Sequence, residues 1–215
     1  MLRYFIDTEF IEHDKTIDLV SIGIVCEDGR ELYLQSCEFS PSFASDWVKE
    51  NVLSRLMLCP HRRYHGEQTV FGDHIDHLQR GQCTFQSVTS TKTGGIFHTG
   101  AHADCFWRTR EEMKNELVHF ITPFQHDMPE LWGWITSYDF VAICQLFGTM
   151  ADLPIGFPHY IHEFQQILDE RGIADRELPE QEEGLHHALH DVRHLKKLWG
   201  YVVHGDAWTV RKDEL

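Results

Sequence analysis

The sequence predicts an α/β fold in which one mixed β-sheet is flanked by helices. Two observations support this fold class. The first 36 residues have the pattern of three consecutive strands, and the second half of the chain shows helical periodicity in four segments. A length of 215 residues, with 42% hydrophobic and 25% charged residues, fits a single domain with its own core.

The N-terminal part is expected to form a three-stranded meander. Residues 2–6 are mostly apolar, and residues 17–26 are rich in β-branched residues and mostly apolar, so both segments favour strands. Asp28-Gly29 is a hairpin signal, and residues 31–36 are expected to form the returning strand.

Helices alternate with one further strand in the rest of the chain. A helix is expected over residues 43–58, and another from Thr109, where Thr109-Arg110-Glu111-Glu112 fits a capping box. Residues 131–135 predict a strand, whose Trp132 and Trp134 are expected in the core. The last three predicted helices each have a glycine after them, and cover residues 138–147, 159–171 and 187–199.

Residues 61–104 differ from their surroundings, because they are rich in His, Gly, Thr and Gln and show weak periodicity. We predict an insertion here, within a domain spanning residues 1–200 that is followed by a tail over 201–215. Three interpretations stay open for it: a structural zinc site, a loop that grips substrate or forms a dimer, and an idle surface insertion. His61-x₃-His65 and His98-x₃-His102 resemble zinc-ligand spacing. On this segment alone, the chain would be a zinc-binding regulatory protein.

Composition narrows the range of functions. The formal net charge of −15 disfavours a nucleic-acid binder with a broad basic surface. It is compatible with a nuclease that grips its substrate locally, through bound cations. No apolar stretch approaches the ~20 residues that span a bilayer, and the N-terminus does not read as a secretory signal. We therefore expect no membrane association, reduced cysteines and a cytoplasmic location.

Four carboxylates and one imidazole form the candidate site. Asp7 and Glu9 are two residues apart at the end of a strand, so alternation places both on one face. Asp139 lies just inside the helix after residues 131–135, and His186 and Asp191 lie at the start of the last helix. Each feature has a structural explanation when taken alone, such as an exposed strand end or a favourable helix terminus. Together they are the inventory that holds divalent cations and deprotonates a water.

The order D-x-E, then a distant Y-D, then H-x-A-x-x-D is that of the DEDDh 3′–5′ exonuclease superfamily, which this sequence resembles. The resemblance implies an RNase H-like fold. It also implies that two Mg²⁺ or Mn²⁺ ions are held by the four acids of the motifs, with His186 as general base. By motif position these acids are Asp7, Glu9, Asp139 and Asp191.

A closer resemblance exists to the mycobacterial RNase AS-type exoribonucleases, through MLRYFIDTEFIE and LWGWITSYDFVAICQLFG. It implies an exoribonuclease that releases nucleoside 5′-monophosphates from RNA 3′ ends, and a homodimer as in similar enzymes. Thr8 and Phe10 are candidate substrate contacts, because an aromatic ring beside the first motif can stack on a base. A core role is the alternative for Phe10. A proofreading-type exodeoxyribonuclease and a non-catalytic nucleic-acid- or protein-binding module are the alternative functions.

Overall fold

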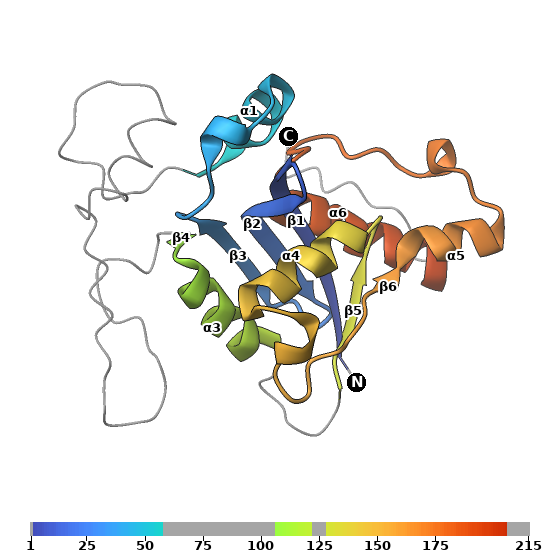
Figure 1. Cartoon of the computed structure of the whole chain (residues 1–215). Helices are drawn as coiled ribbons and strands as arrows, with labels where there is room; N and C mark the ends of the chain where they lie inside the picture. The colour runs from blue at the N-terminus through green and yellow to red at the C-terminus, as the bar shows by residue number, and fades with distance from the viewer. Residues whose placement is uncertain (1, 58–105, 122–127, 206–215) are drawn as a thin grey trace.

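A mixed sheet with the strand order β4-β3-β2-β1-β5-β6 forms the centre of the protein (Figure 1). The computed structural model describes residues 2–57, 106–121 and 128–205. The predicted insertion lies wholly outside these residues, and most of the predicted tail does too. Within the described residues the strands are β1 (Arg3–His13), β2 (Thr16–Cys26), β3 (Glu31–Ser36), β4 (Trp107–Arg108), β5 (Glu130–Gly133) and β6 (His162–Glu163).

Strand pairing follows the chain order at the N-terminus and crosses over later. The β1–β2 and β2–β3 pairs are antiparallel, which confirms the predicted meander. β5 adds to the other side of β1 in parallel, and β6 adds in parallel to β5. β4 pairs in parallel with β3 at the opposite edge. The sheet is therefore mixed, as the sequence predicts.

Helices cover both faces of this sheet, which confirms the predicted α/β class. α3 and α4 lie on one face, and α5 and α6 lie on the other (Figure 1). The described α-helices are α1 (Asp46–Asn51), α3 (Arg110–Ile121), α4 (Ser137–Phe147), α5 (Phe164–Arg171) and α6 (Ala188–Trp199). Short 3₁₀ turns cover Pro41–Phe43, Leu53–Arg55, Met150–Asp152 and Asp175–Glu177, and a π-helical turn covers Gly200–His204.

Alternation along β1 divides its side chains between two cores. Tyr4 and Ile6 pack with buried residues of α3 and α4, whereas Phe5 packs with α5 and α6. The predicted apolar face of α3 is confirmed, since its buried residues include Met113 and Leu117. Burial of these large apolar side chains is the main source of stability, at ~25 cal/mol per Å² of apolar surface.

Two sequence predictions of helix boundaries are wrong. The helix expected over 43–58 is reduced to α1, because the α-helix ends at Val52. Val52 and Leu53 are buried in a small separate core. The helix expected over 159–171 begins at Phe164, because the two preceding residues pair with β5 as β6. The final helix expected over 187–199 is confirmed as α6, and a π-helical turn that was not predicted follows it, with Gly205 in the left-handed region at its end.

Other local predictions are confirmed. The capping box at Thr109 forms, since its backbone N–H donates to Glu112 over 2.8 Å and its hydroxyl accepts from the Glu112 N–H over 3.2 Å. Gly148 and Gly172 follow the last residues of α4 and α5 with positive φ. Trp132 and Trp134 are partly buried against the core formed with α5 and α6.

Candidate active site

Asp7 and Glu9 lie on the side of β1 that faces α6. Both share the alternation of Phe5, which belongs to the α6 core, whereas Thr8 has the opposite alternation. A register shift in the β1–β2 pairing follows directly after Glu9, between Glu9 and Phe10. Such an irregularity changes which way the following side chains point, so the acidic pair occupies the last regular positions of the strand before the shift.

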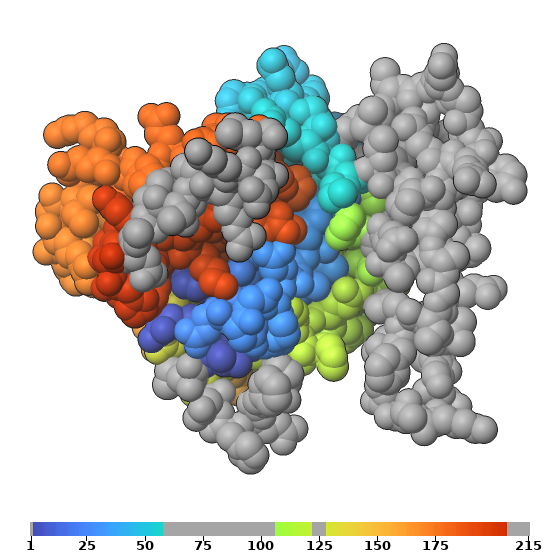
Figure 2. All heavy atoms as spheres, turned by 180° about the vertical axis from the view of Figure 1, so that it is seen from behind, coloured from blue at the N-terminus to red at the C-terminus, as the bar shows by residue number. Residues whose placement is uncertain are grey.

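The start of α6 comes unusually close to the strand beside Asp7. Gly23 on β2 pairs with Asp7, and a Cβ placed on Gly23 would lie 2.4 Å from the backbone of Ala188. Only glycine allows this approach, because any side chain would collide with the helix backbone. The first turn of α6, with Asp191, is thereby held against the strand that carries Asp7. Figure 2, the view from behind, shows α6 against the first strands.

Asp139 reaches the same place from the opposite face of the sheet. It lies in the first turn of α4 and is 6% exposed. One of its carboxylate oxygens accepts hydrogen bonds from the Thr8 backbone N–H (2.8 Å) and the Thr8 hydroxyl (2.6 Å). Thr8, the residue between the two acids of β1, therefore holds α4 to the strand at its acidic position.

His186 and Asp191 complete the group. Among the described residues, one set of three side chains could hold a metal ion, with ligand atoms within 4.8 Å of one another: Glu9, His186 and Asp191. His186 has a left-handed backbone with φ of 62° and meets the edge of the Trp47 ring at 4.8 Å between centroids. Gln181 donates to Asp191 over 2.6 Å.

The carboxylates repel one another in a poorly hydrated environment. Burial raises the pKa of the Asp7 carboxyl far above its ordinary value, and repulsion from Asp139, Glu9 and Asp191 raises it further. Burial, with repulsion from Asp191 and Asp139, raises the pKa of Glu9 to about 8. Burial also raises the pKa of Asp139 to about 6, although its hydrogen bonds from Thr8 oppose the shift. Bound cations would relieve this repulsion, so the donor set suits hard divalent ions.

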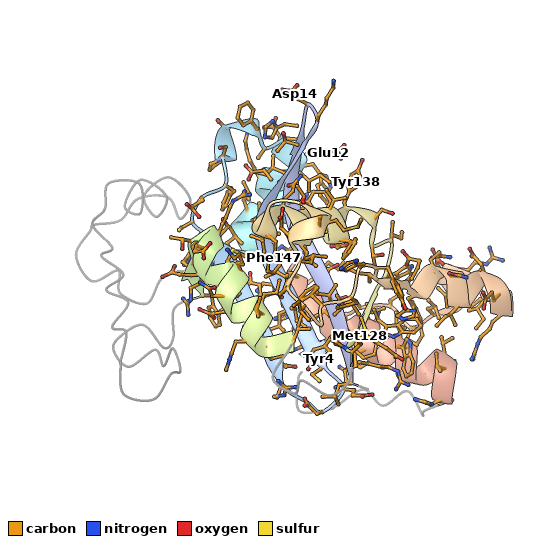
Figure 3. All side chains as sticks on the ribbon, turned by 60° about the horizontal axis from the view of Figure 1, so that its bottom comes forward. Tyr4, Glu12, Asp14, Met128, Tyr138 and Phe147 are labelled. Atoms are coloured by element: carbon orange, nitrogen blue, oxygen red, sulfur yellow. The ribbon has the colours of Figure 1, made fainter. Side chains whose placement is uncertain are left out.

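All five predicted residues are thus brought together. The two candidate substrate contacts, Thr8 and Phe10, lie in different environments. Thr8 is buried and both its donors serve Asp139, so it positions that carboxylate, and its contact with substrate stays a prediction. Phe10 is partly buried beside the core and meets Tyr138 edge-to-face, with centroids 5.7 Å apart. Tyr138 is 44% exposed and lies next to Glu12 (Figure 3). The rings of Phe10 and Tyr138 therefore form an aromatic surface next in the chain to Glu9 and Asp139.

Sequence reasoning missed several contributors to the site. Gln181, Trp47 and Gly23 act through contacts between distant segments and belong to no local motif. A glycine inside a strand was the one available signal, because it often marks a close backbone approach. The paired zinc-like histidines of the segment 61–104 lie outside the described residues, so the zinc interpretation stays a prediction.

Without metal, the protein should lose stability as the pH rises from 6.5 to 8. Glu9 ionises near its ordinary value of 4.5 when unfolded but at about 8 when folded, so the folded state binds more protons in this window. Burial lowers the pKa of His187 from its ordinary 6.5 to about 4. Between pH 4 and 6.5 the unfolded state therefore binds more protons at His187, so this residue makes stability rise with pH and partly offsets the effect of Glu9 there.

The check is the melting temperature of EDTA-treated protein at several pH values. Added Mn²⁺ should raise it more at pH 8 than at pH 6.5, since more carboxylates are ionised and binding stabilises the folded state. Glu9→Gln should flatten the metal-free slope between pH 6.5 and 8. A wild-type melting temperature that rises across this interval would contradict the assignment of repelling carboxylates.

Comparison with known proteins shows which family the chain belongs to. The family model described as the Rv2179c-like 3′-5′ exoribonuclease domain matches residues 86–203, and the chain belongs to this family. The particular relatives are the 3′-5′ exoribonucleases Rv2179c and MT2234.1 of Mycobacterium tuberculosis, from strains H37Rv and CDC 1551. Each is 34% identical over 192 residues, which cover 89% of this chain and 88% of the relative.

Proposed function

We propose that the protein is a metal-dependent 3′–5′ exoribonuclease of the DEDDh type that releases nucleoside 5′-monophosphates. The observation that carries this proposal is the convergence of Asp7, Glu9, Asp139 and Asp191 with His186, from three separate parts of the chain. Family membership adds support for RNA as the substrate, because the matched relatives are named 3′-5′ exoribonucleases.

The four carboxylates would hold two Mg²⁺ or Mn²⁺ ions, which when bound supply positive charge to the phosphate and acidify a water. The chain's own contribution is the arrangement of these ligands. Thr8 fixes Asp139 from β1, and the approach of α6 at Gly23 fixes Asp191. Such fixed orientation means that little reorganisation is needed when the substrate arrives.

His186 would take the proton of the attacking water. The new bond would form between the water oxygen and phosphorus, while the bond from phosphorus to the 3′ oxygen breaks. The departing 3′ oxygen takes a proton from solvent, so the products are a 5′-monophosphate and a new 3′ hydroxyl. His186 is partly exposed at the start of α6, and its ring nitrogen lies near the carboxylates of Glu9 and Asp191. Trp47 packs against its ring and limits its movement.

The charge distribution favours metal-mediated binding over a basic surface. Several arginines of the described part of the chain form ion pairs with acids, as in the pairs Arg193–Glu31 and Arg3–Glu130. With a formal net charge of −15, the attraction for a polyanion must arise locally, at the bound cations. No described helix is long and apolar enough to cross a bilayer. Homodimerisation stays a prediction, for which light scattering of the purified protein is the direct test.

The decisive experiment uses one RNA oligonucleotide labelled at either end. With Mg²⁺, the 3′ label should appear at once as a mononucleotide, and the 5′ label should move down a ladder one nucleotide at a time. EDTA should stop both. A matched DNA oligonucleotide should be degraded more slowly. Equal or faster cleavage of DNA would favour the proofreading-type alternative, and RNA binding in EDTA with no release of mononucleotide in Mg²⁺ would favour the binding module.

A further inference from the structure

We infer that Glu163 is a positioning residue for Asp139, which holds the turn between β5 and α4 in the conformation that presents this acid. The inference rests on the proposed function, since it concerns the assembly of the same site. Glu163 ends β6 and pairs with Gly133, the last residue of β5. Its side chain thus lies beside the turn that leads from β5 to Asp139.

The Glu163 carboxylate accepts hydrogen bonds from the N–H and O–H groups of this turn. One oxygen accepts from the Ile135 backbone N–H over 2.7 Å. The other accepts from the Thr136 backbone N–H over 2.9 Å and from the Thr136 hydroxyl over 3.3 Å. The first oxygen also accepts from the Gln165 N–H over 3.2 Å, which caps α5. Each oxygen therefore has two donors, and this saturation identifies Glu163 as a support and not as a further metal ligand.

The turn needs such a support because its backbone is strained. Ile135 has φ of 61°, a left-handed conformation that is unfavourable for a β-branched residue. Its side chain is 72% exposed, so packing does not hold it there. Gly133 adds a constraint, since a Cβ at that position would lie 2.3 Å from the Thr136 side chain. The hydrogen bonds to Glu163 are thus the interactions that fix this conformation.

The turn sets the position of Asp139 directly. Thr136 precedes α4 as its N-cap, and its carbonyl accepts from the Phe140 N–H over 3.0 Å. The Thr136 side chain makes no capping bond to the helix, because its hydroxyl is turned towards Glu163. Asp139, three residues after Thr136, is consequently anchored from two sides: by Thr8 of β1 at its carboxylate, and by Glu163 of β6 through its backbone.

The chain offers a matched control at the other end of α4. There Asp152 accepts from the Thr149 backbone N–H over 2.9 Å and from the Thr149 hydroxyl over 2.7 Å. This carboxylate makes the same pair of bonds to a threonine as Glu163 does, but it follows the C-terminal end of α4, whereas Asp139 lies at the N-terminal end. Asp152→Asn therefore reports the general effect of losing such a carboxylate.

The experiment compares Glu163→Gln with Asp152→Asn in the full chain. Removal of a residue that orients a metal ligand typically weakens metal affinity or activity ~10- to 100-fold. We expect Glu163→Gln to weaken Mn²⁺ binding by calorimetry, and to lower kcat on RNA, by about 10-fold or more, with KM changed by less than about 3-fold. Asp152→Asn should leave Mn²⁺ affinity and kcat within about 2-fold of wild type.

Three outcomes would overturn the inference, and a fourth would refute the proposed function instead. Wild-type Mn²⁺ affinity and kcat in a folded Glu163→Gln protein would overturn the inference, and so would equal losses in Asp152→Asn. If Glu163→Gln does not fold, Thr136→Val removes one bond of the same turn and should still weaken Mn²⁺ binding ~3-fold; unchanged binding in that variant would overturn the inference. A wild-type protein that releases no nucleotide in Mg²⁺ would refute the proposed function instead, so the two failures are distinguishable.

Discussion

Asp7→Asn should abolish RNA degradation while raising the melting temperature of the metal-free protein at pH 8. Activity falls because the variant loses the ligand that lies among the three other carboxylates. Metal ions supply several kcal/mol of transition-state stabilisation, so the rate should fall ~10³-fold or more. Stability rises because the Asp7 carboxyl is buried among like charges, which raises its pKa far above 3.8. In the metal-free protein, its ionisation at higher pH opposes folding, and asparagine removes this effect.

Two measurements on one preparation test this prediction: nucleotide release in Mg²⁺, and thermal unfolding in EDTA. Asp14→Asn is the matched control, because Asp14 is an exposed acid on the same β1–β2 hairpin. It removes the same charge and should change activity by less than about 2-fold. Wild-type turnover by Asp7→Asn would refute the two-metal assignment. A lower metal-free melting temperature at pH 8 would refute the account of charge repulsion.

His186→Ala should lower kcat by about 10²- to 10⁴-fold, the usual contribution of a general base, while Mn²⁺ still binds. The imidazole is positioned by its left-handed backbone and by Trp47, and it lies within reach of the acids. Its role as a base predicts a loss in the chemical step. A role as metal ligand, which the same distances permit, predicts a loss in Mn²⁺ affinity.

Calorimetry with Mn²⁺ and steady-state kinetics on RNA separate these two roles. His190→Ala is the control, since His190 is an exposed histidine of the same motif and should retain activity within about 3-fold. A tenfold weaker Mn²⁺ affinity in His186→Ala would assign His186 to the metal and remove it as the base. A wild-type rate would exclude it from both roles.

The strands, the hairpin and the helix start could be predicted because each depends on residues that are neighbours in the sequence. β2 and β3 follow from their apolar runs and the Asp28-Gly29 hairpin, and the start of α3 from its capping box. The two-residue strands β4 and β6 were missed, since their length leaves no periodicity and only pairing with a neighbouring strand defines them.

The candidate site divides in the same way. The motif order identified the five side chains, and alternation placed Asp7 and Glu9 on one face. What fixes them could not be read from the sequence. The bond from Thr8 to Asp139 joins residues 131 positions apart, and that from Ile135 to Glu163 joins residues 28 apart. Such contacts depend on tertiary packing, which local sequence propensities do not predict.

The close approach of α6 to Gly23 has a consequence for biosynthesis. Asp7 precedes Asp191 by most of the described chain, so the proposed ligand set is incomplete until α6 docks on β2. Under the proposed function, a chain that is still being synthesised therefore has no complete nuclease centre until α6 has folded onto the sheet.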